Sequence, residues 1–94
     1  MQKELELDLI NGQFSTEDAR ELLVDLFSRK TNFHEIKNFS ANERFGQDDP
    51  LHLNRIDALM NSIQQLNLFF QALDTSDHNL LIKSVVTITV KPTA

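Results

Sequence analysis

Four basic side chains near the middle of the chain have the types and the spacing of an anion-binding site. Lys30, His34 and Lys37 follow one another at i, i+4 and i+7, so a continuous helix would place them along one line. Arg44 lies in a stretch that we expect to be a loop, and its guanidinium could fold back to form a bidentate contact. Together they could hold the carboxylate or phosphate of a small ligand. The alternative is that these long side chains pass the edge of the core and pair with nearby acids.

The same segment begins like a zinc-binding helix but does not complete the motif. His34 and Glu35 match the start of His-Glu-x-x-His, and the fifth position is Asn38 where the second ligand is needed. Neighbouring helical residues point about 100° apart, so His34 and Glu35 would not share a metal. The acidic pair Asp48-Asp49 lacks the alternating ligands and the glycine of a calcium loop. We therefore expect no metal and no cofactor.

Composition excludes several other kinds of chemistry. The chain has no cysteine, which removes disulfides, thiolate metal sites and thiol catalysis. Its two glycines, Gly12 and Gly46, are too far apart for a glycine-rich phosphate loop or a Gly-x-Ser-x-Gly nucleophile elbow. The net charge of −5 argues against nucleic acid and anionic membrane surfaces as partners. These exclusions favour a protein that is not an enzyme.

The chain has the length of a single domain, residues 1–94, and no membrane segment is expected. The first six residues contain two glutamates where a signal peptide needs an apolar run. The longest charge-free stretch, residues 58–73, is interrupted by asparagine and glutamine and would not cross a bilayer. We expect a cytoplasmic protein.

The first half of the chain predicts a strand followed by a helix. Leucines alternate with acids over residues 4–10, which is the period of a strand with one wet face, and Asn11-Gly12 favours a turn. Ser15 is a suitable N-cap for a helix over residues 16–38, with acids in its first turn. We expect this helix to end or bend between Thr31 and Ser40, and residues 40–49 to form a loop.

The second half predicts a helix followed by a strand. Asp49-Pro50 is a strong helix start, with aspartate as N-cap and proline at the first helical position. Apolar residues then recur at spacings of three and four over residues 50–74. Residues 81–90 are rich in β-branched side chains and predict a second strand, which Pro92 follows.

This order predicts an α+β fold, a β-α-α-β unit. The strands at the two termini should form a two-stranded antiparallel sheet covered by a helical hairpin. An isolated two-stranded sheet is marginally stable, so we expect a homodimer in which the open edge of the second strand extends the sheet to four strands.

Two surfaces are predicted to form the interface. The second helix has an uncharged amide face containing Leu68, and interface centres are depleted of charge. The predicted interface residues are Gln64, Gln65, Leu68 and Phe69 on this helix, and Val85 and Thr87 on the second strand. The first functional hypothesis is a non-enzymatic, self-associating binding or regulatory module. The alternative is a small anionic-ligand binding protein or enzyme that uses Lys30, His34, Lys37 and Arg44.

Overall fold

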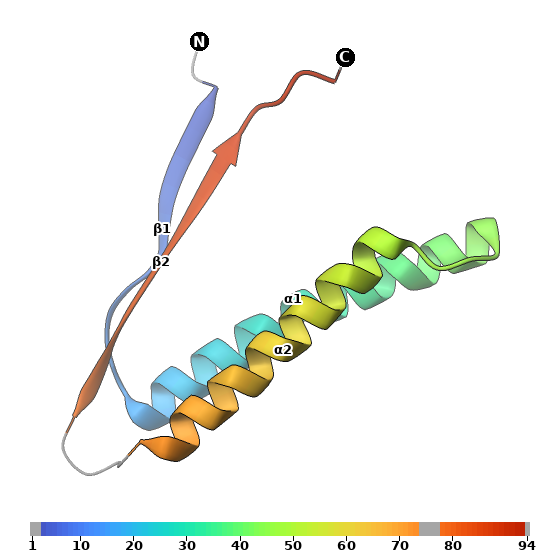
Figure 1. Cartoon of the computed structure of the whole chain (residues 1–94). Coiled ribbons are helices and arrows are strands. Elements are labelled where there is room, and N and C mark those ends of the chain that lie inside the picture. Colours follow the sequence, from blue (N-terminus) through green and yellow to red (C-terminus); the bar gives the residue numbers. More distant parts are fainter. Residues whose placement is uncertain (1–2, 74–77, 94) are drawn as a thin grey trace.

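The computed structural model describes residues 3–73 and 78–93 and has the expected β-α-α-β order. Its elements are β1 (Glu4–Ser15), α1 (Thr16–Phe45), α2 (Pro50–Ala72) and β2 (Asn79–Thr89). The two strands pair antiparallel in one two-stranded sheet. The two helices, which come between the strands in the sequence, form an antiparallel hairpin (Figure 1). The predicted fold class is thereby confirmed, while extension of the sheet in a dimer stays a prediction.

The two predicted N-caps mark the starts of the helices. The Ser15 hydroxyl accepts a hydrogen bond from the Asp18 amide at 3.1 Å, at the start of α1. The Asp49 carboxylate accepts from the Leu51 amide at 3.0 Å, with Pro50 at the first position of α2. Gly46 ends α1 with a φ of 70°, and its amide donates to the Asn42 carbonyl at 2.8 Å.

Both N-terminal elements are longer than the sequence predicts. β1 continues through Asn11-Gly12, which form no turn because the long β2 offers them partners: Asn11 pairs with Lys83 and Gly12 with Ile82. α1 continues through Thr31, whose hydroxyl donates to the Phe27 carbonyl at 2.8 Å and so is satisfied within the helix. The expected loop over residues 40–49 shrinks to 46–49. The expected end of the second helix at residue 74 lies outside the described residues.

A register shift in the sheet gathers the apolar side chains on one face. Leu7 pairs with Val86, but after a shift between Asp8 and Ile10, Ile10 pairs with Ser84. The extra residue is Leu9, so the odd-numbered leucines before this bulge and the even-numbered apolar residues after it share a face. We call this face the apolar sheet face; its large members are Leu5, Leu7, Ile10, Phe14, Leu80, Ile82, Val86 and Ile88.

The helical hairpin covers only part of this face. α1 contacts the sheet near the Ser15 corner, and from there the sheet runs toward the chain termini while the hairpin diverges from it toward the α1–α2 loop (Figure 1). Ile10 is accordingly buried, whereas Leu5, Leu7 and Ile88 are about half exposed, at 44%, 53% and 51%. The core within one chain is therefore thin.

Between the helices the packing is apolar near the sheet and polar toward the loop. Ala19, Leu59 and Phe70 are buried in the apolar part. Further along, the buried α1 residues are Thr31 and His34.

Candidate functional site

The structure brings the predicted basic residues only partly together. The Lys30 and Lys37 ammonium groups lie 5.2 Å and 5.7 Å from the centre of the Phe33 ring, one on each side along the helix. Lys37 and Arg44 line one shallow hollow together with Phe45. These three cations thus follow the exposed surface of α1.

His34 belongs to a different environment. It is 6% exposed and is turned toward α2, where its Nδ1 lies 2.8 Å from Nδ1 of His52. The His52 Nε2 lies 3.9 Å from a carboxylate oxygen of Asp49. Because its ring is enclosed between the helices, His34 does not share an open surface with Lys37 and Arg44.

The interior position lowers the pKa of His34. Burial is the main cause, and the nearby Lys30, His52 and Arg55 side chains lower the pKa further. The His34 Nε2 is buried and, among the described residues, has no hydrogen-bond partner.

His52 was not predicted to be the partner of His34, although its position in the apolar repeat of α2 indicates it. It lies on the three–four repeat of α2 that continues through Ile56 and Leu59, so its side chain had to face α1.

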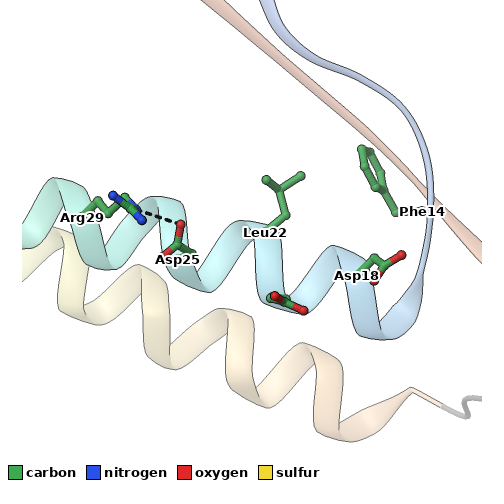
Figure 2. A pocket seen from close by; sticks show the side chains of 6 residues that line it. Phe14, Asp18, Leu22, Asp25 and Arg29 are labelled. Carbon is green, nitrogen blue, oxygen red and sulfur yellow. Dashed lines mark hydrogen bonds and ion pairs between the residues drawn. The ribbon is translucent and has the colours of Figure 1, made fainter.

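A groove opens where α1 diverges from the sheet (Figure 2). Phe14 and Leu22 form its apolar side, and Asp18, Glu21 and Asp25 line it with carboxylates. The one cation there, Arg29, is bound to Asp25 at 2.9 Å, and both side chains are exposed. The groove contains no residue pair suited to nucleophilic catalysis.

Clusters of potential metal ligands and membrane-spanning helices are also absent from the described part of the chain. No group of three or more histidine, aspartate or glutamate side chains is placed to hold a metal ion over residues 3–73 and 78–93. Neither α1 nor α2 is long and apolar enough to cross a membrane.

Among the described residues, the outer edge of β2 has no strand beside it. The Val90 amide donates to the Lys3 carbonyl at 2.8 Å, so Val90 faces β1. Since hydrogen-bonding directions alternate along a strand, Val86 and Ile88 also face β1, whereas Val85 and Thr87 direct their N–H and C=O groups outward. The two predicted strand residues of the interface therefore lie on the open edge.

The outer edge of β1 has a different character. Its matching outward positions are Glu4, Glu6 and Asp8, which pair with Thr89, Thr87 and Val85 across the sheet. Acidic side chains and the bulge at Leu9 are both features that oppose edge-to-edge pairing. β2 has no charged residue between Lys83 and Lys91.

The predicted helical part of the interface is exposed. Leu68 and Phe69 of α2 are 59% and 55% exposed. Gln64 and Leu68 line a shallow hollow with Met60, whereas Phe69 packs edge-on against the buried Phe70, with ring centres 5.6 Å apart.

The surface of one chain is larger than a compact monomer needs. Its accessible area is 7631 Å², against about 5,500 Å² for a compact monomer of this size. Its radius of gyration is 17.1 Å, against about 12 Å for a compact domain of this length. The excess of about 2,000 Å² comes with apolar side chains on the sheet and on both helices.

Comparison with protein-family models, with curated proteins and with solved structures finds no match for this chain.

Proposed function

We propose that this protein is a non-enzymatic, self-associating binding or regulatory module whose copies pair along β2 into a four-stranded sheet. The observation that carries the proposal is the exposed surface of the single chain. An excess of about 2,000 Å² is comparable to what each partner buries in a large obligate dimer, where the total is about 2,000–5,000 Å². A second copy of the chain is the occupant that would remove this excess from water.

The two sheet edges support β2 as the pairing edge. Val85 and Thr87 offer outward backbone groups between uncharged, β-branched neighbours. Pairing β1 with a second β1 would instead bring rows of carboxylates together. The α2 face around Leu68 would supply a second contact area, either in the same dimer or for another partner.

The alternative of an anion-binding protein has weaker support. Three of its four residues remain on the α1 surface, and the fourth, His34, is enclosed by the hairpin and bonded to His52. An anion at Lys37 and Arg44 would be open to solvent, where charged contacts contribute little.

A proline pair tests the proposed edge. Thr87→Pro removes an outward N–H of β2, and Glu6→Pro removes the outward N–H of the residue directly opposite on β1. Both positions lie on an outer edge, where proline leaves the β1–β2 ladder intact. Light scattering after size-exclusion chromatography should show a dimer for the parent and for Glu6→Pro, and a monomer for Thr87→Pro.

Circular dichroism keeps this comparison interpretable. All three proteins should show the same helix content, because α1 and α2 do not depend on the outward amides. A monomeric parent chain at millimolar concentration would refute self-association. A Thr87→Pro protein that is still dimeric would refute the β2 edge, and loss of the dimer in Glu6→Pro alone would move the interface to β1.

A further inference from the structure

The hydrogen bond between His34 and His52 can form only in certain protonation states of the two rings. A hydrogen bond between two Nδ1 atoms 2.8 Å apart needs one nitrogen that carries a proton and one that does not. The pair can therefore be neutral, or it can carry one positive charge. A second charge would leave two N–H groups pointing at each other, so the hydrogen bond would be lost.

The charged groups around the pair disfavour a proton on His34. The outer nitrogen of His52, Nε2, lies 3.9 Å from a carboxylate oxygen of Asp49. Around His34 the neighbouring charges are Lys30 on α1 and Arg55 on α2, both positive. Protonation of His34 would also place a charge in the buried space between the helices, where its Nε2 has no described partner.

The pair occupies the place where the hairpin has the least apolar packing. Toward the loop, Ile36, Phe39 and Phe45 of α1 are 56%, 64% and 72% exposed. Polar contacts also join the helices there: Asn38 accepts from the Asp49 amide at 2.7 Å and donates to Asp48 at 3.2 Å. Beyond Thr31, His34 is the one described α1 residue that is buried, so the histidine pair is a central contact between the outer halves of α1 and α2.

We infer that the histidine pair is a pH-sensitive contact that holds the loop end of the helical hairpin closed at neutral pH and releases it in acid. The device is independent of the proposed dimer, because both histidines and their neighbours belong to one chain. Release would loosen residues from about His34 to His52, while the apolar part of the hairpin near the sheet stays packed.

The direction of the pH effect follows from the buried histidine. The pKa of His34 in the folded chain lies below the ordinary value of 6.5, so the unfolded or open chain binds a proton more readily. The stabilisation is complete above pH 6.5 and is lost as the pH falls from there toward the folded pKa. In that window, one proton taken up on opening lowers the closed-to-open equilibrium constant by up to about tenfold per pH unit.

Hydrogen exchange of the full chain at pH 7.5 and pH 5 tests this inference, with protection factors corrected for the intrinsic rate at each pH. The test variant is the double substitution His34→Leu with His52→Leu, which replaces both polar partners by apolar groups. The matched control is His78→Asn, because His78 is exposed and its Nε2 lies 3.3 Å from the Thr16 hydroxyl, at the end of α1 opposite the loop. Amides of residues 34–52 should lose at least tenfold protection in acid in the parent and in the control, and retain it in the double variant.

Equal acid-induced loss in the double variant would overturn the inference, because carboxylates rather than histidines would then be responsible. A parent whose loop end keeps its protection at pH 5 would overturn it as well. If the double variant does not fold, a titration of the histidine ring protons in the parent decides. One ring that titrates well below pH 6.5 supports the inference, whereas three rings that titrate together near 6.5 contradict it.

Discussion

Ile88→Thr should weaken the proposed dimer by more than an order of magnitude. Ile88 lies on the apolar sheet face, pairs with Leu5 and is 51% exposed in the single chain. Complete burial of an isoleucine contributes about 1.5–3 kcal/mol, so burial of the exposed half in a dimer contributes about 0.8–1.5 kcal/mol. Threonine keeps the β-branched shape that the strand needs and removes this apolar gain.

The effect counts twice in a symmetric dimer. Two copies lose about 1.5–3 kcal/mol in total, which raises the dissociation constant by about 12- to 140-fold. Sedimentation velocity over a dilution series measures this constant for the parent and the variant. Far-UV circular dichroism at the same concentrations checks that β1 and β2 remain paired.

Ile36→Thr is the matched control. Ile36 lies on α1 and is 56% exposed, so the substitution has the same chemistry and nearly the same exposure away from the β2 edge. We expect its dissociation constant to change less than threefold. An unchanged constant for Ile88→Thr, or equal changes in both variants, would refute the assignment of the interface to the sheet.

Two further predictions concern stability. Gly46→Ala should destabilise the chain by about 1 kcal/mol, because residue 46 has a φ of 70° that alanine disfavours. An added Cβ would meet no atom within 4 Å, so contacts would neither offset nor increase this cost. In thermal unfolding, the melting temperature should fall more for Gly46→Ala than for Gly46→Asn. If dimerisation and folding are coupled, the melting temperature of the parent should rise by about 3–6 °C for each tenfold increase in protein concentration. A melting temperature that is constant from 5 µM to 500 µM, a range of about two decades, would contradict that coupling.

The fold could be predicted because its signals are local. Ser15, the Asp49-Pro50 pair and the three–four repeat of α2 act within one or two helical turns, and each has the predicted role in the structure. The ends of β1 and α1 differ from the prediction because they depend on contacts with other elements of the fold. Gly12 is held in the strand by Ile82, which is far away in the sequence, and α1 continues past Thr31 alongside α2, where His34 contacts His52.

In the candidate site, too, local patterns were predictable from the sequence, whereas the direction of backbone groups and side chains was not. Val85 and Thr87 could be placed on an open edge from the strand pattern, and their backbone direction follows only from the Val90 bond to Lys3. The spacing of Lys30, His34 and Lys37 suggested a shared surface. It did not show that a difference of a few tens of degrees around the helix turns His34 toward α2 and leaves the lysines beside Phe33.

The contrast between the two sheet edges bears on the size of the proposed assembly. A two-stranded sheet with two equally open edges could add copies without limit and form a filament. Here Glu4, Glu6 and Asp8 and the neighbouring bulge oppose pairing on β1, while β2 is uncharged from Ser84 to Val90. Once two copies pair through β2, each remaining edge is an acidic β1, so growth stops. An assembly through β2 is therefore expected to close at two chains.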